Sequence, residues 1–265
     1  MHEITRASEH VWHIAEIEET YFSIIRGGKS AIVVDTAYGI GDNRGFVEHF
    51  LEGLPYIVIN THGHNDHVSG DYQFDKVWIH PADLPAYQNA NKRMFRMGAY
   101  FMYAKKYDFP AEKKDEYVAV PKTEVGKLSG HETYDLGGVT VSLHHLPGHT
   151  KGEIGLLVNE DRLLLSGDSF SDDCYMFADN HDSLETLQHT VEKALTLPFD
   201  FYLGSHTTKP LPQTFLKEVL ANTIERKVVP GSEETILGVK TVTILHQGPD
   251  GISKIRVQKD SPELA

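Results

Sequence analysis

Short apolar runs bounded by glycines and polar residues fill the first part of the chain, and this pattern is typical of β-strands. The first two runs are joined by Gly27-Gly28, which predicts a turn. After the second run, Asp42–Leu51 carries apolar residues at helical spacing and predicts a helix. The predicted strands of this part are Tyr21–Arg26, Ala31–Asp35, Tyr56–Ile59 and Val77–Ile79.

From about Leu84 to Tyr107 the pattern changes to good helix formers, in which methionine and aromatic residues alternate with lysine and arginine. The polar stretch Lys105–Glu116 is expected to loop back. We therefore predict a helical insertion at about 84–116. Two roles are open for it: a lid over an apolar acyl pocket, or packing against the domain or a partner subunit.

The second half returns to short strands and contains two predicted helices. Asp182–Leu197 begins with Asp182 and Glu185 in the spacing of a capping box. Gly248-Pro249-Asp250-Gly251 predicts a hairpin near the end. No repeat or linker interrupts the chain, so we expect one mixed α/β domain over residues 1–265. The other predicted elements are Val139–Leu146, Ile154–Val158, Arg162–Ser166, Phe199–Leu203, Pro212–Lys227, Val239–Leu245 and Ile252–Val257.

Composition narrows the class of protein. Hydrophobic residues make up 40% of the chain, enough for a sizeable core, and no stretch reaches the roughly 18 apolar residues of a membrane helix. The first residues lack the pattern of a signal peptide, so a soluble cytoplasmic protein is expected. A net charge of −13 argues against partners such as nucleic acid or an anionic membrane. The sequence leaves association between copies of the chain open.

Histidine is the unusual component, with 16 residues, whereas the single cysteine excludes an intramolecular disulfide and a cysteine-rich metal site. The segment His62-Gly63-His64-Asn65-Asp66-His67 offers four metal ligands within six positions. In an extended loop alternate side chains point the same way, so His62 and His64 can converge on one ion. Asp66 and His67 follow the bend and are placed to hold a second ion.

Three further candidate ligands each follow an apolar strand and a nearby glycine: His149, Asp168 and His206. Loops at strand ends are where open α/β folds place their sites. We predict that His62, His64 and His149 bind one divalent ion, that Asp66, His67 and His206 bind another, and that Asp168 bridges both. Zinc is the default cofactor for such ligands, with iron or manganese as alternatives. A hydroxide bridging two cations is a strong nucleophile, which predicts a hydrolase.

These residues resemble the metallo-β-lactamase superfamily, in the family order and over nearly the whole chain. The resemblance implies an αββα sandwich, two β-sheets packed face to face with helices outside, and a metal site along one edge. It also implies that the chain is not a true β-lactamase, because those enzymes carry Cys or Ser at the position of Asp168. An aspartate bridge is similar to that of the glyoxalase II-type thioesterases, lactonases and phosphodiesterases.

The expected activity is therefore hydrolysis of a small-molecule ester, thioester or lactone, with Asp66 and Asp168 as the catalytic carboxylates. The alternatives are a phosphodiesterase, a β-lactam hydrolase, or a metal-binding regulatory protein without turnover. Tyr38, Tyr175 and Lys209 are candidates for substrate binding, although a solvated surface lysine is an equally good interpretation of Lys209. Asp35 is predicted to orient a ligand rather than to bind metal.

Overall fold

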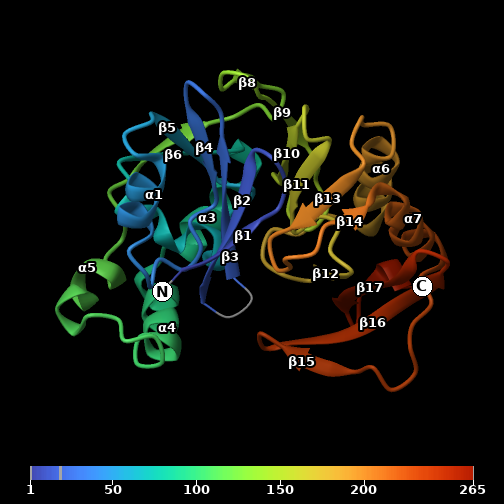
Figure 1. Cartoon of the computed structure of the whole chain (residues 1–265). Helices are drawn as coiled ribbons and strands as arrows, with labels where there is room; N and C mark the ends of the chain where they lie inside the picture. Colours follow the sequence, from blue (N-terminus) through green and yellow to red (C-terminus); the bar gives the residue numbers. More distant parts are fainter. Residues whose placement is uncertain (1, 18–19, 265) are drawn as a thin grey trace.

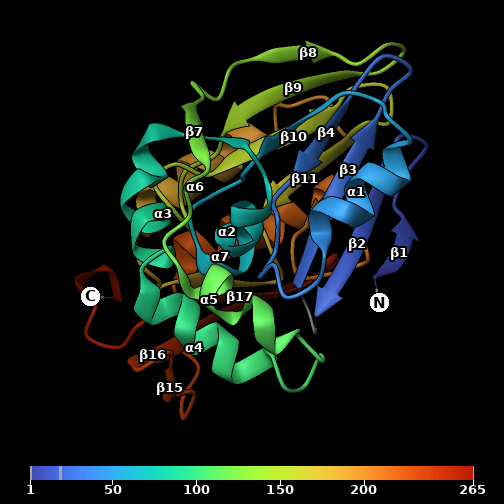
Figure 2. The ribbon, with the colours of Figure 1, turned by 90° about the vertical axis from the view of Figure 1, so that its left-hand side faces the viewer.

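Two β-sheets lie face to face in the centre of the molecule, and helices cover their outer faces (Figure 1). The computed structural model describes residues 2–17 and 20–264. Its layers confirm the predicted αββα sandwich. In Figure 2, turned by a quarter, the helices α3, α4 and α5 face the viewer beside the first sheet.

The first sheet has seven strands in sequence order, antiparallel from β1 to β4 and parallel from β4 to β7. All four residues of β4 are buried. Its side chains alternate between faces, so Ile32 packs toward the second sheet and Val33 toward the outer helices. The strands are β1 (Glu3–Arg6), β2 (Val11–Ile17), β3 (Thr20–Arg26), β4 (Ala31–Val34), β5 (Tyr56–Ile59), β6 (Lys76–Ile79) and β7 (Glu124–Lys127).

The second sheet has six strands in the order β14-β13-β11-β10-β9-β8. In β10, Leu156 faces the first sheet, and Leu157 faces the outer helices α6 and α7. The strands are β8 (Thr133–Asp135), β9 (Thr140–His145), β10 (Ile154–Val158), β11 (Leu163–Gly167), β13 (Phe201–Gly204) and β14 (Leu211–Pro212).

A third sheet at the C-terminal end was predicted only in part. Its order is β12-β17-β16-β15, and β16 and β17 form the predicted hairpin, with Gly248 paired to Gly251. The strand β12 pairs with β17 in parallel, which joins this sheet to the segment that follows Asp168. The strands are β12 (Asp173–Met176), β15 (Glu234–Ile236), β16 (Val239–Gly248) and β17 (Gly251–Gln258).

Helix termini follow from local polar residues. The side chain of Asp42 accepts a hydrogen bond from the backbone N–H of Gly45 and begins α1. The predicted capping box of α6 is wrong, because Ser183, one residue later, accepts from the N–H of Thr186. The helices are α1 (Asn43–Leu51), α2 (Asn65–Val68), α3 (Leu84–Ala90), α4 (Arg93–Tyr103), α5 (Lys114–Val118), α6 (Leu184–Ala194) and α7 (Leu216–Glu225).

The insertion at 84–116 is joined to the domain through a buried arginine on α4. Arg96 is fully buried and donates to the carbonyls of Ser69 and Tyr117 and to the side chain of Asn91. Its guanidinium also lies over the ring of Tyr72. Ser69 directly follows α2, so the insertion packs against the segment that carries His67.

None of the helices within residues 2–17 and 20–264 combines the length and the apolar character needed to cross a bilayer.

A buried carboxyl fixes the loop between β4 and α1. Glu16 accepts hydrogen bonds from the backbone N–H groups of Tyr38, Gly39 and Gly41 and from the side-chain amide of Asn43. Burial raises the pKa of Glu16 from 4.5 to about 7, against the lowering effect of these donors. Between pH 4.5 and about 7, Glu16 is therefore protonated in the folded chain and ionised in the unfolded chain.

This pKa predicts a pH-dependent stability. The contribution of Glu16 is complete below pH 4.5 and is lost as the pH rises through about 7. Between pH 4.5 and 8, the Glu16→Gln variant should lose about 3 kcal/mol less of its free energy of unfolding than the parent chain. Urea unfolding of the metal-free chains at pH 4.5, 6 and 8 measures this difference. Parallel curves for the two chains would contradict it.

Candidate metal centre

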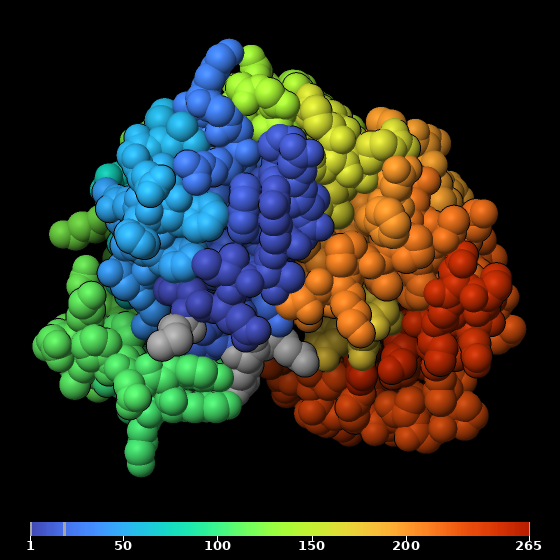
Figure 3. Space-filling model, viewed as in Figure 1, coloured from blue at the N-terminus to red at the C-terminus, as the bar shows by residue number. Residues whose placement is uncertain are grey.

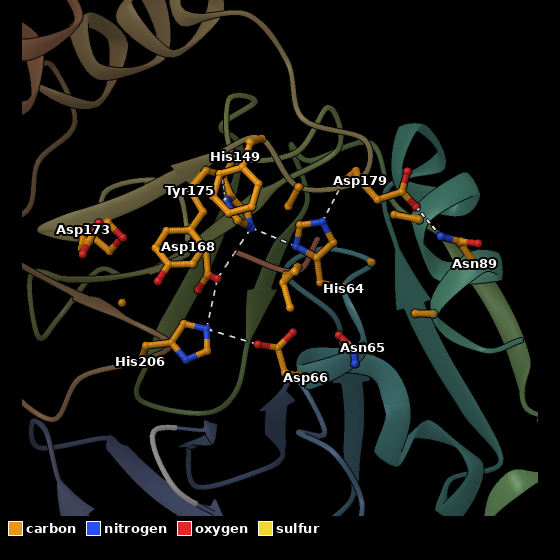
Figure 4. A pocket seen from close by; sticks show the side chains of 18 of the residues that line it. His64, Asn65, Asp66, Asn89, His149, Asp168, Asp173, Tyr175, Asp179 and His206 are labelled. Atoms are coloured by element: carbon orange, nitrogen blue, oxygen red, sulfur yellow. Dashed lines mark hydrogen bonds and ion pairs between the residues drawn. The ribbon is translucent and has the colours of Figure 1, made fainter. Parts of the chain in front are cut away.

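The predicted ligands come from four loops that follow strands of the two sheets, and Figure 4 shows the side chains of His64, Asp66, His149, Asp168 and His206 pointing toward one another. His62 and His64 follow β5, and Asp66 and His67 lie in α2. The remaining three ligands follow β9, β11 and β13, which are strands of the second sheet. The centre therefore lies where one end of each sheet meets the other, at the edge of the sandwich.

The first group of ligands joins His62, His64 and His149, with potential ligand atoms all within 4.8 Å of one another. The Nδ1 atom of His64 lies 3.0 Å from Nε2 of His62 and 2.9 Å from Nε2 of His149. His62 and His64 therefore do converge, as alternate residues of an extended segment can.

The second group joins Asp66, His67 and His206. Nε2 of His206 lies 3.4 Å from Oδ2 of Asp66. Asp168 lies between the two groups, and its Oδ2 is 3.1 Å from Nε2 of His206, 3.5 Å from Nε2 of His67 and 3.6 Å from Nε2 of His149. One carboxylate oxygen thus reaches both groups, which is the position required of a bridge.

Hydrogen bonds on the outer side of the rings fix which nitrogen faces the centre. His149 donates from Nδ1 to the carbonyl of Tyr175 at 2.8 Å, and His64 donates from Nε2 to the carbonyl of Asp179 at 2.7 Å. The nitrogen that faces the centre then carries a lone pair. This is the tautomer that a metal ligand needs.

Burial and neighbouring charges shift the pKa values of the histidine ligands in opposite directions. Burial and the neighbouring His64 lower the pKa of His149 to about 3, and burial with His67 lowers that of His62 well below its usual range. Burial also lowers the pKa of His206, but Asp168 and Asp66 outweigh it and raise this pKa to about 9. His62 and His149 of the first group are therefore neutral imidazoles, whereas the ligands of the second group and Asp168 carry the negative charge that attracts cations.

Buried atoms without partners show that cations fit these residues. Oδ1 of Asp168 and Nε2 of His67 are buried and make no hydrogen bond within the described residues. Burying such atoms unpaired costs free energy. A divalent cation in each group would take up these lone pairs, and imidazole with carboxylate is a donor set that zinc, iron and manganese accept.

Gly63 is required by close packing. A Cβ atom there would lie 2.6 Å from the backbone nitrogen of Tyr87 and 2.8 Å from the carbonyl of Asp83. The helix α3 of the insertion thus rests directly on the metal loop. The sequence indicated only a need for backbone freedom at this glycine.

Sequence reasoning missed Asp83, which connects three of the loops around the centre. This buried carboxylate accepts from the N–H of Gly63, the hydroxyl of Thr150, the N–H of Gly152 and the side-chain amide of Asn180. It holds the loops of His64 and His149 together without touching a ligand atom. The only sequence signal is an acid shortly after a strand end.

Glu153 is the second residue that was missed. It is fully buried, accepts from the backbone N–H of Asp168 at 2.8 Å, and places Oε1 3.4 Å from Nδ1 of His62. Gly167 is constrained by the same contact, because its Cβ would lie 2.1 Å from Oε1 of Glu153 and its φ is +58°. The carboxylate thus positions His62 of the first group and Asp168, the residue between the two groups. An acid immediately before the apolar strand Ile154–Val158 is its sequence signal.

A cavity of about 580 Å³ opens over the centre. His64, Asp66, His149, Asp168 and His206 are in its wall, together with two of the predicted substrate-binding residues, Tyr38 and Tyr175. Lys209, the third, is exposed and does not line this cavity. From the insertion, Phe95 lines the cavity while Arg96 beside it is fully buried, so the insertion both packs on the domain and forms part of the wall.

Asp35 has the geometry of an orienting residue. Its carboxylate accepts from Nδ1 of His67 at 3.0 Å and from the hydroxyl and backbone N–H of Thr61.

We expect Asp35→Ala to weaken binding of the second ion about 10- to 100-fold without abolishing it. Titration against a chelator of known affinity measures this. Asp161→Ala, which removes another carboxylate bonded to a histidine, His10, is the control and should bind metal as the parent chain does. An unchanged affinity in the Asp35 variant would contradict the assignment.

Comparison with known proteins identifies one family. Residues 18–206, well over half of the chain, match the model of the metallo-beta-lactamase superfamily. The solved structure of a metallo-beta-lactamase from Pontibacter korlensis has a similar fold, with a TM-score of 0.60 over 84% of this chain and 99% of that chain. The two chains are 15% identical, so this likeness concerns the fold alone.

Among curated proteins, the acyl-coenzyme A thioesterase MBLAC2 of Bos taurus is 28% identical to this chain over 163 residues. The MBLAC2 of Homo sapiens is 27% identical over 163 residues. Each match covers 55% of this chain and 56% of the relative. The chain thus aligns with little more than half the length of these relatives.

Proposed function

Because the chain belongs to the metallo-β-lactamase superfamily, we propose that it is a hydrolase that uses two divalent metal ions to cleave small-molecule acyl thioesters. The observation that carries this proposal is the convergence of two ligand groups on the single carboxylate of Asp168. A structural metal site closes around one ion, whereas two groups of ligands that share one carboxylate would hold two ions side by side, the arrangement with which two-metal hydrolases bind water and substrate.

Two bound cations would supply a water of lowered pKa as nucleophile and would polarise the carbonyl of the substrate. The residues of the chain provide the conditions for this chemistry. The negative charges of Asp66 in the second group and of Asp168 between the groups would offset the repulsion of two cations held close together. The cavity wall, with Phe95 and Phe177 on it, keeps bulk water from part of the substrate.

A thioester suits this site better than the other candidate bonds. Its leaving group is a thiol of pKa about 8.5, which departs as the thiolate without a proton donor. The cavity wall contains no lysine or arginine within the described residues, so a phosphodiester would find no cationic side chain there other than the candidate ligand His206. The curated relatives named as acyl-coenzyme A thioesterases support the same choice. Zinc is the proposed metal.

The test is metal analysis combined with a panel of acyl thioester, lactone, phosphodiester and β-lactam substrates. We expect two metal ions per chain and the highest kcat/KM on an acyl thioester. Higher activity on a lactone or phosphodiester would overturn the substrate assignment. Two bound ions without turnover on any class would favour a metal-binding regulatory protein instead.

A further inference from the structure

We propose that Leu237, at the tip of the β15–β16 hairpin, is a specificity-determining residue that contacts the alkyl part of the substrate, so that the enzyme prefers long unbranched acyl chains over acetyl. This inference rests on the proposed thioesterase function and deepens it. The hairpin lies outside residues 18–206, the part that matches the family model.

The backbone at Leu237 is unfavourable for leucine. Ile236 pairs with Val239, so Leu237 and Gly238 form a two-residue loop, with φ of +50° and +82°. Loops of this kind favour Asn-Gly or Asp-Gly, because both residues need positive φ. A leucine in this conformation clashes with its own backbone and is rare. Local folding therefore provides no reason for leucine at this position.

The side chain gains nothing from burial either. Leu237 is 83% exposed, the most exposed large hydrophobic residue among those the structure describes. It nevertheless lines the cavity over the metal centre, together with Val239 from the same hairpin. An exposed apolar side chain on a strained backbone at the mouth of a site indicates a contact with a ligand.

Phe95 on the insertion provides a second apolar wall of the same cavity. It is 38% exposed and lines the cavity with Ala86 and Ala90 of α3. Figure 3 shows the surface hollowed between the green insertion and the red C-terminal hairpin. An alkyl chain lying in this hollow would have its carbonyl carbon beside Asp168 and its methylenes against Leu237.

Charge around the cavity also favours an uncharged ligand group. Beyond the candidate ligands, the wall carries Asp172, Asp173 and Asp179, and none of its described residues is a lysine or arginine. This part of the wall therefore offers an anionic group no lysine or arginine among its described residues. An alkyl chain needs no such partner, so this part of the cavity suits the acyl part of a thioester.

An ion-pair network holds the hairpin in this place. Arg256 on β17 makes two hydrogen bonds, of 2.7 and 2.8 Å, with the carboxylate of Asp173. It also forms an ion pair with Glu234 on β15. Asp173 begins β12, the strand that follows the Asp168 loop. The position of Leu237 is therefore fixed relative to the bridging ligand.

The test compares the metal-loaded parent chain with Leu237→Asn on acetyl, octanoyl and dodecanoyl thioesters of N-acetylcysteamine. Each methylene withdrawn from water changes kcat/KM about fourfold. We expect Leu237→Asn to lower kcat/KM on the dodecanoyl substrate by about tenfold or more and to leave the acetyl substrate unchanged. Leu237→Met should keep the preference for long chains. The same loss on all three substrates would overturn the proposal.

Thermal unfolding and a matched variant separate this effect from damage to the fold. Asparagine suits a positive φ, so Leu237→Asn should raise Tm by about 2–4 °C while losing the chain-length preference. Ile252→Asn replaces another exposed apolar residue of the same sheet, 43% exposed and outside the cavity. It should leave the preference intact, and an equal loss in this control would contradict the assignment.

Binding of dodecanol, measured by calorimetry, tests the inference without turnover. We expect Leu237→Asn to weaken dodecanol binding about tenfold and to leave butanol binding unchanged. If no thioester is hydrolysed but this difference is found, the proposed function fails while the alkyl site stands. If thioesters are hydrolysed and dodecanol binds both chains equally, the alkyl site fails and the function stands.

Discussion

Replacing Asp168 by asparagine is expected to lower kcat on an acyl thioester by on the order of 10³-fold. The side chains are nearly the same size, so packing is kept while the negative charge is lost. That charge serves both ligand groups, since one oxygen lies within 3.6 Å of ring nitrogens from each. Two cations held close together without it would repel each other, and we expect the variant to hold fewer than two ions.

The measurement is kcat together with metal content by atomic emission. Asp172→Asn is the matched control, because Asp172 lines the same cavity but belongs to neither ligand group. It should retain both metal ions and turn over within a few-fold of the parent rate. A variant at Asp168 that kept two ions and full turnover would show that this carboxylate is not the bridge.

The sequence predicted best those strands that read as short uninterrupted apolar runs. Residues Tyr56–Ile59 and Ile154–Val158 were placed to the residue, because an uninterrupted apolar run has no other stable place in a sandwich. The strand Asp173–Met176 was missed because its sequence, Asp-Cys-Tyr-Met, carries no such run. It forms because β17, more than seventy residues later, offers it a parallel partner. Pairing over that distance leaves no local signal.

The candidate site divides in the same way. The seven candidate ligands could be picked out because each is a metal-binding side chain directly after a strand or inside the histidine-rich loop. Asp83 and Glu153 could not, because their partners come from distant loops and their roles exist only when those loops meet. Leu237 could not be identified either. Its significance depends on a backbone angle and on the cavity it faces, and neither is written in the residues around it.

Removal of the metal ions should abolish turnover and lower the stability of the chain. Dialysis against a chelator is expected to reduce kcat/KM to the background rate, and zinc added back should restore it. Binding at a thousandfold excess over Kd stabilises a fold by about 4 kcal/mol for each site, which corresponds to a fall in Tm of roughly 10 °C for each ion removed. Scanning calorimetry with and without zinc measures the shift.

The physical reason lies in the buried atoms that the cations satisfy. Without the cations, Oδ1 of Asp168 and Nε2 of His67 stay buried without a hydrogen bond among the described residues, and the three imidazole rings of the first group face one another. Asp168→Asn, with fewer ions to lose, should show a smaller Tm shift on chelation than the parent chain. Equal Tm shifts in the two chains would mean that the stabilising ion is held elsewhere. Full turnover after chelation would refute a metal-dependent reaction.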